Sequence, residues 1–108
     1  MPPPPSLDLA FHALADPTRR AVVMRLATGA ESVGSLAQSH KMALPSFLKH
    51  VGVLEQAGLI ATEKVGRVRT CRLNPSALQG LKSWLSEQEA IWESRTDRLQ
   101  ALVENRDQ

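Results

Sequence analysis

The stretch ALPSFLKHVGVLEQAG, from Ala43 to Gly58, restricts the possible folds most, because its two sides are chemically opposite. Apolar residues recur in it at spacings of one, three and four, which gathers them on one side of an α-helix. The residues predicted to be buried are Phe47, Leu48, Val51 and Leu54. The other side has no carboxylate and carries Ser46, Lys49, His50 and Val53, so it fits a polyanion. Gly58 ends the predicted helix, because glycine adopts the left-handed conformation of a helix C-terminus without steric cost.

Charge is distributed unevenly along the chain. The formal net charge is only +2, but residues 17–72 hold nine Lys or Arg against three Glu, whereas residues 73–108 hold four against six acidic residues. A basic middle and an acidic tail indicate a nucleic-acid face on the first part and a different task for the second. With 108 residues, the chain has room for one modest core and is predicted to be a single domain.

Several classes of protein are disfavoured by the composition. The only cysteine, Cys71, excludes an intrachain disulfide or a cysteine-rich zinc site and is typical of a reducing cytoplasm. No apolar run approaches the roughly 20 residues that span a bilayer, so we expect a soluble, cytoplasmic protein with no membrane partner. The three histidines lie on separate predicted elements without paired carboxylates or a phosphate-binding loop, so we expect neither an enzyme nor a cofactor.

The first part of the chain reads as short helices. Pro2 to Pro5 predict a disordered lead over residues 1–6, and an apolar helix follows over 7–15. Asp16-Pro17 then begins a helix over 18–27, because the Asp16 carboxylate can accept the free amides of the first turn and Pro17 has no amide to lose. Three cations of this helix are predicted to project away from its buried side: Arg19, Arg20 and Arg25.

Two further helices, so closely joined that they must cross steeply, predict a helix-turn-helix. Ser32 caps the first over 33–40, and a connection of about three residues leads to the helix over 43–58. In this arrangement the first helix lies across the DNA backbone and the second enters the major groove. The candidate DNA contacts are Ser35, Gln38 and Ser39 on the first helix and Ser46, Lys49 and His50 on the second. An alternative for His50 is that it braces the helix-turn-helix.

Residues 59–65 and 68–73 predict two strands around a Gly66-Arg67 turn. The basic hairpin over 62–72 has the character of a wing, with Lys64, Arg67 and Arg69 as DNA contacts. The alternative is a solvated hairpin whose cations protect its edges. Cys71 is predicted to be a small buried apolar residue, and the alternative is a redox role in which nearby arginines lower its pKa.

Asn74-Pro75 starts a long final helix with a heptad-like apolar row. The row is too wide for one small core, so we predict a homodimer, and the alternative is packing on its own domain only. The predicted interface residues are Leu78, Leu81, Leu85, Trp92 and Leu99. The acidic residues of this helix predict a solvated face rather than a metal site: Glu87, Glu89, Glu93 and Asp97.

The runs LADPTRRAVVMRLATG, LPSFLKHVGVLEQAGLI, KVGRVRTCRLNP and WESRTDRL resemble the ArsR family of winged-helix bacterial transcription regulators, nearest the branch with LPSF in the recognition helix and GRVRT in the wing. The resemblance implies a mainly α fold with a small β-hairpin, in the order of four helices, two strands and a final helix. It also implies a homodimer that binds a near-palindromic double-stranded operator, and most members repress. The Cys-x-Cys pair of metal-sensing members is missing, so we predict no metal.

The sequence therefore divides the predicted domain into a DNA-binding core over 7–73 and a dimerisation helix over 74–105, behind the lead over 1–6. The sequence does not identify the effector that releases the protein from DNA, whether a small molecule or another signal. Two other functions stay open at this point: a winged-helix module that binds proteins rather than DNA, and a redox-responsive regulator that acts through Cys71.

Overall fold

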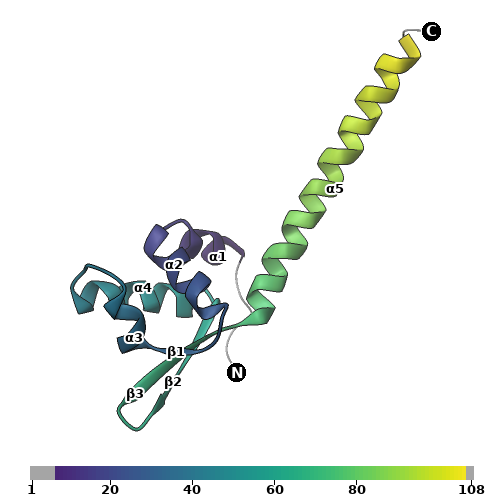
Figure 1. Ribbon diagram of the computed structural model, residues 1–108. Coiled ribbons are helices and arrows are strands. Elements are labelled where there is room, and N and C mark those ends of the chain that lie inside the picture. The colour runs from purple at the N-terminus through teal and green to yellow at the C-terminus, as the bar shows by residue number, and fades with distance from the viewer. Residues whose placement is uncertain (1–6, 107–108) are drawn as a thin grey trace.

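The computed structural model describes residues 7–106, and the lead predicted at 1–6 lies outside the described residues. The helices and strands follow one another as α1 (Leu7–Leu14), α2 (Pro17–Leu26), β1 (Glu31–Ser32), α3 (Val33–Gln38), α4 (Leu44–Gln56), β2 (Ile60–Val65), β3 (Val68–Leu73) and α5 (Pro75–Arg106). The fold is mainly helical with one small antiparallel sheet (Figure 1), which confirms the predicted fold class.

The helix boundaries follow the predicted capping residues. The Asp16 carboxylate accepts a hydrogen bond from the backbone amide of Arg19 at 3.1 Å, at the start of α2. The Ser32 hydroxyl likewise accepts from the amide of Ser35 at 3.1 Å, at the start of α3. Gly58 has φ +76° immediately after α4, the left-handed conformation predicted for it. These three caps are confirmed, although α3 ends at Gln38, two residues before the predicted end.

The sheet has three strands in the order β1-β3-β2, not the two strands that the sequence predicted. The predicted hairpin is confirmed, with Val65 paired to Val68 across the two-residue loop and Gly66 at φ +62°. The additional strand, β1, pairs Glu31 with Cys71 and Ser32 with Thr70. Two residues are too short to show an alternating pattern, so this strand had no signal in the sequence. It ties the start of α3 to the hairpin.

One hydrophobic core joins the five helices and the sheet. Its largest fully buried side chains are Val22, Leu36, Phe47, Leu54, Leu59 and Cys71. Burial confirms the apolar interpretation of Cys71.

The prediction for Leu48 is wrong, because its side chain is 44% exposed. At 3.6 residues per turn, Leu48 lies about 100° around α4 from Phe47 and away from Leu54, so the core reaches only the narrower stripe that Phe47, Val51 and Leu54 form. Val53, predicted for the outer face, is half-buried and packs against the core.

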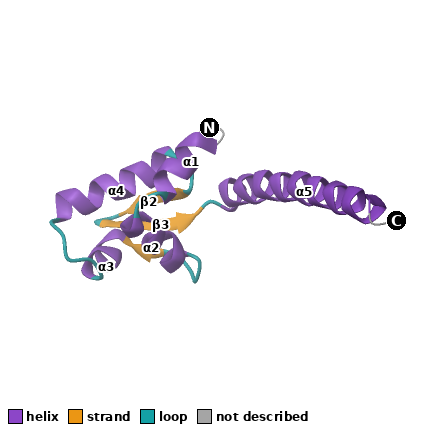
Figure 2. Cartoon of the chain, turned by 90° about the horizontal axis from the view of Figure 1, so that it is seen from above, coloured by secondary structure: helices purple, strands orange, loops and turns teal. Residues whose placement is uncertain are grey.

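Helix α5 leaves the body of the protein (Figures 1 and 2). Its 32 residues make a rod of about 48 Å at 1.5 Å per residue, and the described chain measures 73 × 33 × 22 Å. Only its first turns reach the core, where Ala77 and Leu81 are buried and Leu78 is partly buried. From Lys82 to Glu104 every side chain is exposed. Within residues 7–106, no helix combines the length and apolar character that crossing a membrane requires.

Candidate nucleic-acid interface

Helices α3 and α4 form the predicted helix-turn-helix, and a surface without acidic groups runs over both. The sequence has no Asp or Glu between Glu31 and Glu55, so α3, the turn and most of α4 lack carboxylates. In the turn, the His40 ring stacks on Phe47 with centroids 5.3 Å apart. The exposed residues on this surface include Gln38, Lys41, Ser46 and Lys49.

His50 has a different environment from the other candidates of α4. Its Nδ1 atom lies 3.1 Å from Nη1 of Arg19 and 3.8 Å from a carboxylate oxygen of Asp16. Because a guanidinium group only donates hydrogen bonds, the first contact requires Nδ1 to be the acceptor. The His50 side chain is only 24% exposed. The contact with Arg19 ties α4 to α2 and favours the alternative in which His50 braces the helix-turn-helix.

Arg19 is the centre of this brace. Its Nε donates to the Ala13 carbonyl at 2.7 Å and its Nη2 to the His12 carbonyl at 3.2 Å. These carbonyls belong to the last turn of α1, beyond which no further helical turn supplies amide donors. The His12 carbonyl also accepts from the backbone amide of Ala15 at 3.2 Å. The hydrogen bond from the backbone amide of Arg19 holds the pKa of Asp16 below its ordinary value. One arginine thus joins α1, α2 and α4.

The other two arginines of α2 are also engaged inside the chain. Arg20 donates to the Leu14 carbonyl at 2.8 Å, again at the end of α1. Arg25 forms an ion pair with Glu31 at 3.0 Å and donates to the hydroxyl of Ser39. A count of cations along the sequence therefore overstates the charge available to DNA, and Ser39 already has a partner in the free protein.

The predicted wing is the hairpin of β2 and β3. Lys64 and Arg69 are opposite each other in the strand register, Arg67 lies in the turn, and all three are exposed. Arg69 donates to the Thr62 hydroxyl at 3.0 Å, and Thr62 donates to Glu55 of α4 at 3.1 Å. Lys64 and Arg67 form no ion pair within residues 7–106. Near the tip of the wing, Lys64 and Arg67 therefore remain without an ion pair among the described residues. Arg69 instead connects the hairpin to α4 through Thr62.

Cys71 shows none of the features of a reactive thiol. It is fully buried, and burial, with a smaller effect of Glu55, raises the pKa of its thiol above the ordinary value. Arg69 acts in the opposite direction but is the weakest of the three influences. The proposed lowering of the Cys71 pKa by neighbouring arginines is therefore wrong, because desolvation disfavours the thiolate more than the arginine favours it.

The predicted interface residues on α5 divide into two groups. Leu81 is 7% exposed and belongs to its own chain's core, and Leu78 packs partly against that core. The others are open to solvent, with Leu85 at 49%, Trp92 at 70% and Leu99 at 64% exposed. Further large apolar side chains that α5 exposes are Ile91, Leu102 and Val103. A single chain therefore provides contacts for the first group and leaves the second without cover.

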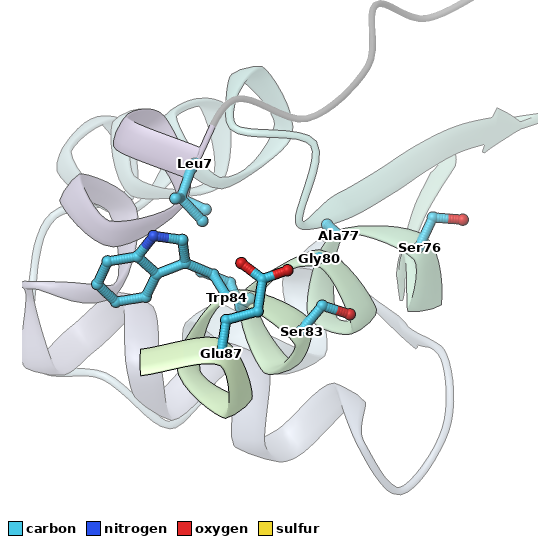
Figure 3. Close-up of a pocket in the computed structure, with 9 residues that line it drawn as sticks. Leu7, Ser76, Ala77, Gly80, Ser83, Trp84 and Glu87 are labelled. Atoms are coloured by element: carbon cyan, nitrogen blue, oxygen red, sulfur yellow. The ribbon is translucent and has the colours of Figure 1, made fainter. Parts of the chain in front are cut away.

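A groove of about 350 Å³ lies where α1 meets α5 (Figure 3). Leu7 of α1 and Trp84 of α5 point toward each other across it, and the Trp84 ring meets Phe11 edge-on at 5.4 Å between centroids. The remaining lining residues are mostly small: Ala10, Ser76, Ala77, Gly80, Leu81, Ser83 and Glu87. Trp84 lines the groove and is itself 38% exposed, next in the chain to the exposed Leu85.

No group of three or more His, Cys, Asp or Glu side chains within residues 7–106 is arranged to hold a metal ion. The acidic residues that were considered for that purpose, Glu87, Glu89, Glu93 and Asp97, are exposed on α5.

Comparison with known proteins identifies relatives over most of the chain. Residues 14–63 match a family described as Helix-turn-helix domain. The chain is 41% identical to the HTH-type transcriptional regulator Rv2034 of Mycobacterium tuberculosis over 78 residues, which are 72% of this chain and 73% of that protein. It is 32% identical to the transcriptional repressor SdpR of Bacillus subtilis over 79 residues, which are 73% of this chain and 88% of that one.

A solved structure agrees with these relatives in fold as well as sequence. The crystal structure of the ArsR family transcriptional regulator RHA00566 is 51% identical to this chain, covers 82% of it and 91% of its own length, and superposes with a TM-score of 0.78. The fold of most of this chain thus occurs in a protein whose sequence is also similar. The chain belongs to the ArsR family of winged helix-turn-helix transcriptional regulators.

Proposed function

We propose that the chain is a homodimeric repressor that binds a near-palindromic DNA operator through α4 and the wing. The observation that carries the proposal is the surface without carboxylates between Glu31 and Glu55, together with the exposed cations Lys49, Lys64 and Arg67. Cations on such a surface displace counterions from phosphates, which is the main source of affinity for DNA. The repressor assignment draws support from the name of the relative SdpR, a transcriptional repressor.

The candidate residues divide the work on DNA among three elements. We propose that Ser46 and Lys49 of α4 contact base edges or flanking phosphates, and that His50 acts by holding α4 in position. Ser35 and Gln38 of α3, and Ser39 directly after it, hold the DNA backbone, with Ser39 presented by Arg25. Lys64, Arg67 and Arg69 of the wing contact phosphates or the adjacent minor groove.

A second copy of the chain is the proposed partner of α5. Large exposed apolar surfaces are uncommon on monomers, and Leu85, Trp92 and Leu99 are left exposed by residues 7–106. Leu78 and Leu81 support their own core and contribute less to the interface. A two-fold dimer sets two recognition helices roughly 34 Å apart, one turn of DNA, and repression follows when the dimer occludes a promoter.

We also propose that the chain is nearest to the branch of the family that has LPSF in the recognition helix and GRVRT in the wing. We propose that the protein acts in the cytoplasm, where its DNA partner lies, and that it performs no catalysis.

The test is a binding titration with DNA that the purified protein selects from a random-sequence pool. Selected duplex should bind much more tightly than random duplex, and Lys49→Ala or Arg67→Ala should each reduce the slope of log affinity against log salt by about one. Lys82→Ala, an exposed cation at the start of α5, is the matched control and should leave the slope unchanged. Equal binding of selected and random duplex, with no change in slope, contradicts the assignment and favours a protein-binding module.

A further inference from the structure

One flank of α4, between its buried stripe and Lys49, carries an unexpected row of residues whose side chains have no polar groups: Leu44, Leu48 and Gly52. Successive members are four residues apart, so they are neighbours along the helix surface. Leu44 is 54% exposed and Leu48 is 44% exposed. The ends of these two side chains meet solvent although α4 has a well-formed apolar stripe elsewhere, on Phe47, Val51 and Leu54.

Gly52 adds a second, independent observation to the row. A Cβ atom placed on Gly52 would meet no atom within 4 Å among residues 7–106, so packing within that part of the chain does not require a glycine there. Glycine in the interior of a helix is unfavourable compared with alanine, and its structural use is to let another surface approach the backbone closely. The row therefore has the features of a surface that contacts another molecule. It consists of two exposed leucines followed by a glycine that the fold does not require.

The charge around the row selects the kind of partner. Lys41 and Lys49 are exposed beside it, and no acidic residue occurs in the sequence from Ser32 to Leu54. This surface suits a polyanion that also displays apolar groups. The major groove of DNA meets both conditions, because the C5-methyl group of thymine is the apolar group among the base edges that it presents.

We propose that Leu44 and Leu48 read thymine methyl groups in the operator, and that Gly52 lets α4 lie deep enough in the groove for this contact. The inference rests on the proposed DNA-binding function and names the chemistry of base recognition within it. It assigns specificity to apolar contacts on a helix that has few polar groups able to contact bases.

The test replaces thymine by deoxyuridine, one position at a time, in a duplex of roughly 30 base pairs selected by the full-length protein, about three turns of DNA. Deoxyuridine removes the methyl group and keeps the base pair. At one or more positions in each half-site the dissociation constant should rise about three- to fivefold, the effect expected for one methyl group taken out of a contact. In Leu48→Ala or Leu44→Ala the same duplexes should bind with no further loss, because the methyl group has lost its partner.

Two matched variants separate this contact from general effects. Met24→Ala removes an exposed apolar side chain on α2, 73% exposed, and should keep the full response to deoxyuridine. Gly52→Ala should raise the midpoint of thermal unfolding and yet weaken binding of the selected duplex several-fold.

The outcomes distinguish the inference from the function beneath it. Sequence-specific binding without any response to deoxyuridine, or with the same response in wild type and in both leucine variants, overturns the inference and leaves the proposed function standing. Failure to select any sequence from the pool overturns the proposed function, and the inference with it.

Discussion

Nη1 of Arg19 lies 3.1 Å from Nδ1 of His50, so the side chain that closes the end of α1 also holds the recognition helix. The geometry of α4 therefore depends on a residue of α2 that is not expected to touch DNA. In a repressor, such a contact affects binding through the position of the helix and not through charge on the interface.

The Arg19–His50 contact predicts that Arg19→Lys destabilises the protein by about 1–2 kcal/mol, because lysine keeps the charge but loses the fork that reaches three acceptors. His50→Ala should cost about 1 kcal/mol, and the double variant should cost less than the sum, since the two residues share one contact. Urea unfolding followed by circular dichroism measures these values. Arg67→Lys at the wing tip is the control, and additive losses in the double variant would contradict the brace.

Trp92→Glu should convert the dimer to monomers, because it places a charge in the middle of the exposed apolar row of α5. Light scattering gives the mass, and operator affinity should fall along with dimerisation. Ser86→Glu, on the other side of the same helix, is the matched control and should stay dimeric. A dimeric mass for Trp92→Glu would place the interface elsewhere.

Leu81→Ala should lower the stability of the folded core, whereas Leu99→Ala should weaken association of the subunits. Leu81 is buried in its own core, so its truncation should lower the free energy of unfolding by about 2–3 kcal/mol at any protein concentration. Leu99 is 64% exposed, so its truncation should weaken association and leave the isolated core unaffected. Unfolding midpoints measured over a range of protein concentrations separate the two effects. Equal concentration dependence for both variants would remove the distinction between core and interface on α5.

Cys71 should resist thiol reagents in the folded protein at pH 8 and react once the protein is unfolded, because it is fully buried and burial raises its pKa. The folded thiol keeps its proton more tightly than the unfolded one. Its contribution to stability is therefore complete below the ordinary pKa of 9.0 and falls as pH rises through the folded pKa. The difference in unfolding free energy between wild type and Cys71→Ala should shift accordingly above pH 9. Rapid native-state labelling, or a change of operator affinity on treatment with peroxide, would restore the redox alternative.

Local chemistry made much of this fold predictable. Asp16, Ser32 and Gly58 act within a few residues of their own position, so their roles as caps follow from the sequence. The hairpin at Gly66 is local in the same sense. Strand β1 escaped prediction because its two residues become a strand only through pairing with β3, which is about forty positions away in the chain.

The candidate site was harder to predict than the fold because a sequence counts charges without their partners. Arg19, Arg20 and Arg25 appeared to be part of a basic surface, yet each is engaged by carbonyls, a carboxylate or a hydroxyl inside the chain. Periodicity likewise predicted that Leu48 is buried, because it does not show which edge of the apolar stripe of α4 meets the core. These outcomes depend on how the helices pack, and no spacing along one helix contains that information.

Because most of α5 is exposed, folding of its distal part depends on the protein concentration. From Lys82 to Glu104 the helix receives almost no support from its domain, and isolated helical segments are only marginally stable in water. If a second copy supplies the missing contacts, ordering of the distal helix and association are one coupled event, and part of the binding energy is spent on ordering. Dilution would then melt the end of the helix as it separates the subunits, and so expose that segment to proteases. The cellular level of such a repressor would be limited by the same equilibrium that assembles it.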